Sequence, residues 1–110
     1  MRQALTVRVF ISGPANGLPD RNVSAFHAAG NALRAVGHVV VYPTHIDAPA
    51  KSDRLAHVRA SLVQLVTCDA IYLLDGWERS EAARLEHAVA GVLHMGVIFG
   101  VHNALALEGI

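Results

Sequence analysis

Glu86 is the residue of this sequence best suited to covalent chemistry. It lies in the segment 82–93, where most other residues are apolar, so we expect its carboxylate to face a partly buried site. A carboxylate in such a place can attack an anomeric carbon or stabilise an oxocarbenium ion, and both are steps of glycosyl transfer. The alternative is a glutamate on a solvated helix face, and the sequence leaves both interpretations open.

Two short segments could hold a ligand beside such a carboxylate. The first is Ser12 to Gly17 (SGPANG), whose two glycines permit a close backbone approach and whose Ser12 and Asn16 side chains offer hydrogen bonds. The alternative is an ordinary tight turn. The segment is neither a GxGxxG nor a Walker loop, so it indicates neither a dinucleotide nor a nucleoside triphosphate.

The second segment is Asp75 to Ser80 (DGWERS). The indole of Trp77 could stack on a base or a sugar. A hydroxyl and free backbone amides at Ser80, if it begins a helix, would favour an anion. The alternatives are that Trp77 packs on a neighbouring subunit and that Ser80 only caps its helix.

Strands and helices are expected to alternate along the chain. Apolar runs rich in β-branched and aromatic residues predict strands at 7–12, 39–42, 70–74 and 97–101. Apolar positions at helical spacing predict helices at 22–36, 55–66 and 82–93, with Asp53 and Ser80 as N-caps. This order predicts a single α/β domain over residues 1–110, with an open, doubly wound parallel sheet in the order 2-1-3-4 and helices on both faces.

The strand order also predicts where a ligand binds. In doubly wound sheets, ligands lie outside the carboxyl ends of the strands, near the point where the strand order reverses. That point falls between the first and third strands, and the loops that follow them are residues 13–21 and 75–80. We therefore expect both segments to belong to one site.

The composition limits the partners of the protein. Apolar residues make up 53% of the chain and charged residues 16%, which is more apolar surface than a small monomer can easily hide, so we expect a homo-oligomer, a dimer or larger. Nine basic and nine acidic residues cancel, so we expect neither polymeric nucleic acid nor a membrane surface as a partner.

The cysteine content indicates a reducing compartment. Cys68 is the only cysteine, and the sequence has neither a signal-peptide pattern nor an apolar run long enough to span a bilayer, so we expect a cytoplasmic protein. The seven histidines are scattered without the paired spacing of a zinc motif. We therefore expect no metal and no other cofactor.

The order of these pieces resembles a known family. The stretches ISGPANGLPDRN, AFHAAGNALRAVGH and CDAIYLLDGWERS, the last followed by ARLEHAVA, are similar to those of DUF4406-type proteins of the nucleoside 2-deoxyribosyltransferase-like superfamily. The resemblance covers residues 7 to 99. It implies a flavodoxin-like or Rossmann-like three-layer sandwich and a pocket for a nucleoside or nucleoside 5′-monophosphate.

The resemblance also implies a role for individual residues. Glu86 matches the glutamate that attacks C1′ of the deoxyribose in enzymatic relatives, and Ser80 matches the capping serine that contacts phosphate or sugar. The strand-one loop and Gly76-Trp77 match the sugar and base contacts, and Asn22 and Phe26 also fit the pattern. With the loop residues above, the expected binding residues are Ser12, Gly13, Pro14, Asn16, Gly17, Asp20, Asp75, Gly76, Trp77 and Ser80.

Three positions depart from the pattern that the resemblance implies. Phe10 stands where relatives usually have a tyrosine that could orient the glutamate, Ser61 where they often have an aspartate that shuttles a proton, and Ala82 where they have a glycine. These departures favour a second hypothesis, a nucleotide sensor or sequestering module with weak or no turnover. In a third hypothesis, the loops serve only contacts between proteins.

Overall fold

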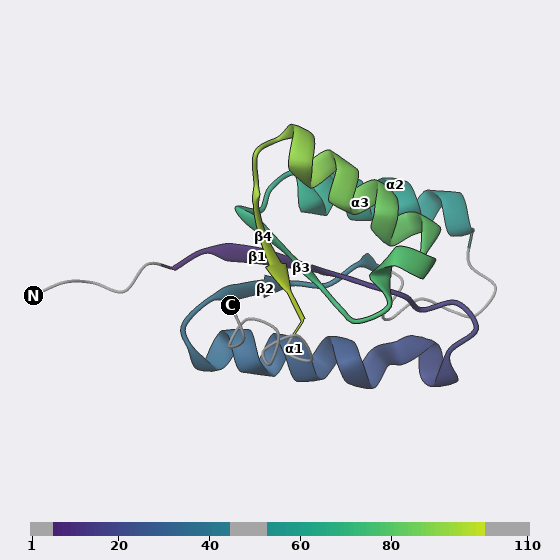
Figure 1. Ribbon diagram of the computed structural model, residues 1–110, viewed down its shortest axis with the longest axis horizontal. Coiled ribbons are helices and arrows are strands. Elements are labelled where there is room, and N and C mark those ends of the chain that lie inside the picture. The colour runs from purple at the N-terminus through teal and green to yellow at the C-terminus, as the bar shows by residue number, and fades with distance from the viewer. Residues whose placement is uncertain (1–5, 45–52, 101–110) are drawn as a thin grey trace, which may run out of the picture.

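Strands β1 and β3 form the middle of the sheet, as the sequence predicts. In a computed structural model, which describes residues 6–44 and 53–100, four strands pair in the order β2-β1-β3-β4 (Figure 1). All three pairings are parallel. The strands are β1 (Arg8–Ser12), β2 (Val39–Val41), β3 (Ala70–Leu73) and β4 (Gly96–Phe99). The predicted α/β fold, with a flavodoxin-like arrangement of strands, is confirmed.

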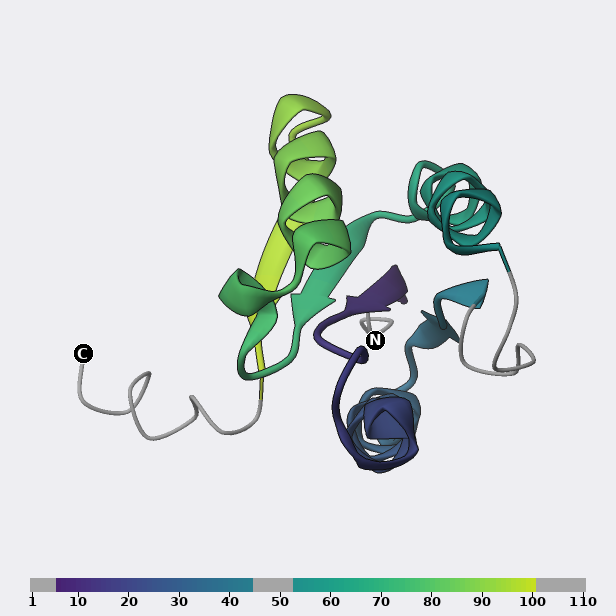
Figure 2. The ribbon, with the colours of Figure 1, turned by 90° about the vertical axis from the view of Figure 1, so that its right-hand side faces the viewer.

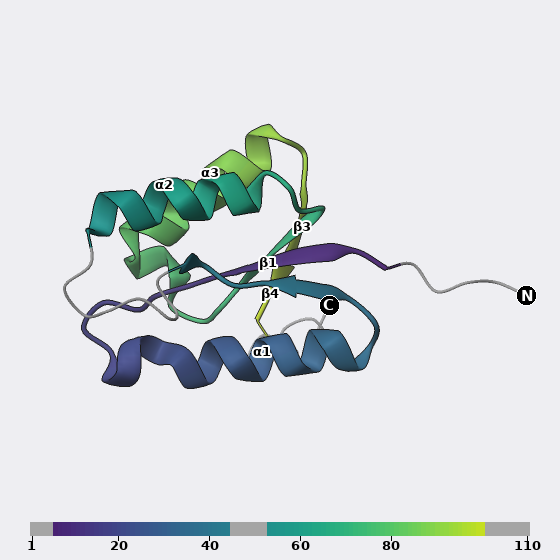
Figure 3. The same cartoon turned by 180° about the vertical axis from the view of Figure 1, so that it is seen from behind.

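The helices cover the two faces of this sheet unequally. Helix α1 (Val23–Ala35) lies on one face, and α2 (Arg54–Leu65) and α3 (Glu81–Val92) lie together on the other (Figures 1 and 3). Figure 2 shows α2 and α3 side by side above the strands, with α1 below them. The predicted helices are confirmed, and their ends differ by only a residue or so from the pattern.

Each face of the sheet has its own hydrophobic core. Because side chains alternate along a strand, neighbouring residues of β1 enter different cores. The core under α1 contains Val9, Ile11, Phe26 and Tyr72, whereas the core under α2 and α3 contains Phe10, Leu65, Ile71 and Ala90. Both central strands are buried throughout, apart from the partly exposed first residue of β1.

Both predicted N-caps are present. The Asp53 carboxylate accepts hydrogen bonds from the backbone N–H groups of Leu55 and Ala56 at the start of α2. The Ser80 hydroxyl oxygen accepts from the N–H of Ala83 at the start of α3. These bonds satisfy backbone donors that have no partner within the helix.

Two short 3-10 helices were not predicted: η1 (Pro19–Asn22) and η3 (Trp77–Arg79). Both lie in the loops expected to hold a ligand. In η1, Asp20, Arg21 and Asn22 have left-handed backbone angles, with φ of 51°, 50° and 64°. Aspartate and asparagine adopt such angles more readily than other residues with a side chain, but arginine seldom does. The residue types of this loop predict a turn, but they do not predict three successive left-handed residues.

Within the described ranges, no helix is long and apolar enough to cross a membrane.

Candidate active site

The Glu86 side chain lies inside the molecule. It belongs to the buried side of α3, together with Ala83 and Ala90, and only 4% of its surface is exposed. The spacing of three and four residues places these side chains on one helix face, toward the sheet. The alternative that Glu86 lies on a solvated helix face is therefore wrong.

Ser12 is the hydrogen-bond donor to this carboxylate. Its hydroxyl donates to Glu86 Oε1 at 2.5 Å, and the bond joins residues that are 74 positions apart in the sequence. Ser12 is the last residue of β1 and is fully buried. The contact thus places Glu86 at the carboxyl end of the first strand, where a doubly wound sheet binds its ligands.

Burial changes the acidity of Glu86. It raises the pKa of the carboxyl from its ordinary value of 4.5 to about 7, because the protein interior disfavours the charged form, while the hydrogen bond from Ser12 acts in the opposite direction. About half of the molecules then hold an ionised Glu86 at neutral pH. A group that titrates there can act as a nucleophile or as an acid under ordinary conditions.

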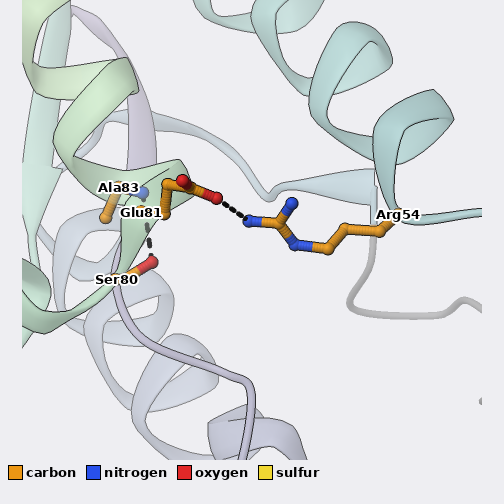
Figure 4. Close-up of polar contacts among 4 residues, drawn as sticks. All are labelled: Arg54, Ser80, Glu81 and Ala83. Atoms are coloured by element: carbon orange, nitrogen blue, oxygen red, sulfur yellow. Dashed lines mark hydrogen bonds and ion pairs between the residues drawn. The ribbon is translucent and has the colours of Figure 1, made fainter.

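The amino end of α3 is tied to the amino end of α2. Ser80 caps α3, and Glu81, the first residue of the helix, forms an ion pair with Arg54 of α2 at 2.6 Å (Figure 4). The Ser80 oxygen accepts from the Ala83 N–H at 3.1 Å, so its own proton remains available for a ligand. Both helices therefore present their amino ends at the same edge of the sheet.

Trp77 is already in contact with a side chain of its own chain. Its ring centroid lies 4.6 Å from that of His87, at an interplanar angle of 47°. The indole also packs, half-buried, against the core under α2 and α3. Trp77 thus lies on the same side of the sheet as Glu86, and His87 covers part of the ring that was expected to meet a base.

Other predicted binding residues line a groove on the opposite face of the sheet. This groove has a volume of about 520 Å³, and Pro14 and Asp75 border it together with Asn22 and Arg79. Its floor and walls are apolar and come from α1, from β3 and from the residue that follows β3: Ala25, Ala28, Ala29, Ala32, Tyr72 and Leu74. Neither Glu86 nor Ser12 lines it. The residues that the sequence assigned to one site therefore divide between two faces.

The family of the chain follows from comparison with known proteins. A family model described as "Domain of unknown function (DUF4406)" matches residues 7–99. The chain belongs to the DUF4406 family. No curated protein matches it at a significant level. The resemblance seen in the sequence is thereby confirmed for DUF4406 itself, whereas the wider deoxyribosyltransferase-like superfamily stays a prediction.

In this DUF4406 protein, two of the predicted glycines have structural reasons for being glycine. A Cβ on Gly13 would lie 2.6 Å from the Cβ of Leu74, so the missing side chain lets the loop after β1 pass the end of β3. Gly76 has a φ of +88° in the turn before η3, an angle that favours glycine. Close approach to a ligand is thus not needed to explain either residue.

The rest of the strand-one loop is exposed. Asn16, Gly17 and Asp20 all lie on the surface of the DUF4406 domain, outside both the Ser12–Glu86 contact and the lining of the groove. Their assignment to ligand binding stays a prediction. Among residues 6–44 and 53–100, no three histidine, cysteine or acidic side chains are grouped as metal ligands would be.

Sequence reasoning missed the groove, and it did not single out Arg79, which borders it. A signal for it was present, because alanines at positions 25, 28, 29 and 32 follow helical spacing and form a row of small side chains on α1. Such a row leaves space above the sheet where larger side chains would fill it. This row could be interpreted as the wall of a groove only once the carboxyl end of β3 was known to face it.

Proposed function

We propose that this protein breaks, or transfers across, the N-glycosidic bond of a deoxynucleoside or deoxynucleoside 5′-monophosphate, with Glu86 as the nucleophile. The observation that supports this proposal most directly is the buried Glu86 carboxylate, hydrogen-bonded to Ser12 at the carboxyl end of β1. A carboxylate buried to this degree costs stability even with one hydrogen-bond donor, so its presence is best explained by chemistry.

The proposed reaction has two steps. An ionised Glu86 oxygen attacks C1′ of the sugar, the C1′–N bond breaks, and its electron pair leaves with the base, which takes up a proton from solvent or a nearby group. Water or a second base then attacks C1′ and releases the carboxylate, so the overall reaction is hydrolysis or base exchange. This is the double displacement that carboxylates carry out in retaining glycoside hydrolysis.

The amino end of α3 offers a place for the sugar or phosphate. The Ser80 hydroxyl keeps a proton to donate, and the first turn of a helix favours negative charge. Trp77 and Gly76 would lie toward the base. This assignment includes membership of the nucleoside 2-deoxyribosyltransferase-like superfamily and requires neither a metal nor another cofactor.

Incubation with a panel of deoxynucleosides and deoxynucleoside 5′-monophosphates tests the proposal, with released base measured by chromatography. We expect base release from at least one compound, and its loss in Glu86→Gln. Glu81→Gln is the matched control, because Glu81 lies on the same helix with its side chain 75% exposed. No release by the wild-type protein from any compound, or full activity in Glu86→Gln, would refute the proposal.

A second candidate is a binding module on the same fold. It is supported by Ser61, which is 2% exposed and accepts a hydrogen bond from the Thr44 backbone N–H at 3.1 Å. This position is therefore used in packing, and it has no acidic group to protonate a leaving base. Calorimetry separates the two candidates, because tight nucleotide binding without any base release supports the module.

We also propose that the protein is a homo-oligomer and acts in the cytoplasm. Large apolar side chains remain exposed in the single chain, among them Val92 at 78%, Val36 at 66% and Val63 at 63%. Water contact with such side chains is unfavourable, and association would remove it. Sedimentation of the full chain tests this, and a mass near that of one chain at micromolar concentration would contradict it.

A further inference from the structure

Ser12 was expected to bind the ligand, but its surroundings suggest another role. We propose that Ser12 is the positioning residue for Glu86: its hydroxyl holds Oε1, so that Oε2 is left to face the sugar. This inference rests on the proposed function for its catalytic meaning. The contact itself can be tested without any substrate.

The packing of β1 against α3 explains why residue 12 meets residue 86. Phe10 and Ala90 share the core under α2 and α3, and Ser12 contacts Glu86. Two residues along a strand advance about 7 Å, and four residues along a helix about 6 Å. Because α3 runs antiparallel to the strand, the step from Phe10 to Ser12 matches the step from Ala90 back to Glu86.

The hydroxyl of Ser12 donates a hydrogen bond to Glu86, which Phe10 cannot do. Phe10 is fully buried among apolar side chains and has no polar atom to offer. A buried carboxylate needs a donor, because a buried acceptor without a hydrogen bond destabilises the folded state. Ser12 lies two residues further along β1, on the same face of the strand, and provides that donor at the carboxyl end of the strand.

A ligand-binding role fits Ser12 less well. The residue is 0% exposed, and its single hydroxyl proton is directed to Glu86. The neighbouring titratable side chains along α3 have other partners, since Glu81 pairs with Arg54 and His87 contacts Trp77. Ser12 therefore orients the carboxylate, and its hydrogen bond lowers the pKa of Glu86 against the larger effect of burial, which raises it.

Carbon-detected NMR titration of the side-chain carboxyls tests this role. The sequence has only four glutamates, so the Glu86 signal can be assigned by its loss in Glu86→Gln. Removal of the donor in Ser12→Ala should raise the Glu86 midpoint by roughly one pH unit, about the effect of one hydrogen bond to a charged group. Ser12→Thr keeps the hydroxyl and should keep the midpoint near the wild-type value.

Ser61→Ala is the matched control, because it removes an equally buried serine hydroxyl that bonds to Thr44. It should leave the Glu86 midpoint unchanged. An unchanged midpoint in folded Ser12→Ala, or an equal shift in Ser61→Ala, would overturn the proposal. If Ser12→Ala does not fold, Ser12→Cys decides, since its weaker thiol donor must still raise the midpoint.

Turnover gives the second readout. With the midpoint one unit higher, kcat of Ser12→Ala should fall roughly fivefold at pH 7 and recover by pH 9, while KM changes little. A merely structural role would lower activity equally at all pH values. If the wild-type protein releases no base, the proposed function fails, and the Glu86 titration still decides the role of Ser12. If the wild-type protein is active but the Glu86 midpoint is unchanged in Ser12→Ala, only the positioning role is refuted.

Discussion

The two faces of the sheet differ at the carboxyl ends of β1 and β3. On the α3 face, the contact between Ser12 and Glu86 is closed off from water. On the α1 face, Pro14 and Asp75 border an open groove. Asp75 is exposed and keeps its hydration, whereas Glu86 has lost it. The comparison teaches that burial, and not the choice of a carboxylate as such, raises the pKa of Glu86.

The largest expected effect concerns the dependence of stability on pH. Below about pH 4.5 Glu86 is protonated in both the folded and the unfolded chain, so it adds no dependence. Between that pH and about 7 the unfolded chain ionises first, because the folded pKa is raised to about 7, and the folded state loses stability as pH rises. Above pH 7 the loss is complete, at about 3 kcal/mol.

Glu86→Gln should remove this dependence, since the amide does not titrate. We expect the variant to be more stable than the wild-type protein by about 3 kcal/mol at pH 8, and the two to converge near pH 4.5. Urea denaturation across this range measures the difference. Parallel stability curves for the two proteins would show that the Glu86 pKa is not raised by folding.

The second prediction concerns Gly13, where the loop after β1 passes the end of β3. In Gly13→Ala the new methyl would lie 2.6 Å from the Leu74 Cβ, so the loop after β1 and the end of β3 must separate. We expect a loss of about 1–3 kcal/mol in the free energy of unfolding, which thermal denaturation can measure.

Gly91→Ala is the control for this change. Gly91 lies within α3, and a Cβ there would meet nothing within 4 Å. Alanine should therefore stabilise the helix by up to about 1 kcal/mol. An equal loss of stability in both variants would argue against the close contact at Gly13.

A smaller effect should show whether the faces act independently. Ala28→Leu places a larger side chain in the α1 groove, where Ala28 is exposed. We expect a change in unfolding free energy within about 0.5 kcal/mol and no change in the Glu86 titration midpoint. A shifted midpoint, or a raised KM for a nucleotide that the wild-type protein turns over, would show that the groove and the Glu86 site are coupled.

The smallest expected effect is that of the ion pair between α2 and α3. Arg54 and Glu81 are 50% and 75% exposed, so solvent screens their attraction. We expect Arg54→Ala to cost less than about 0.5 kcal/mol at low salt and nothing measurable in 1 M salt. A larger loss, measured by urea denaturation at both salt concentrations, would mean that the pair fixes the spacing of the two helices.

Most of the fold could be predicted because local patterns and chain order agree. Continuous apolar strands between amphipathic helices leave few topologies open, and the right-handed crossover rule selects the order of the strands. The caps at Asp53 and Ser80 followed from residue type alone. The three successive left-handed residues Asp20, Arg21 and Asn22 could not be predicted, because arginine seldom adopts this conformation.

The candidate site was predictable only in part. The carboxyl ends of β1 and β3 were expected to supply it, and Glu86 does lie beside the end of β1. The division of the predicted site residues between opposite faces of the sheet was missed, because it depends on which residue ends β1. The side chain of Ser12 points toward α3, and the chain then turns so that Pro14 borders the α1 groove. The direct contact of Ser12 with Glu86 depends on a helix-to-strand register that no local pattern records.

The long sequence separation of Ser12 and Glu86 also has a consequence for synthesis of the chain. The first strand leaves the ribosome early, but its partner carboxylate follows 74 residues later. Until α3 has emerged and docked, the glutamate is an ordinary hydrated acid. The shifted titration of this one side chain would therefore report the moment at which the nascent protein closes its core.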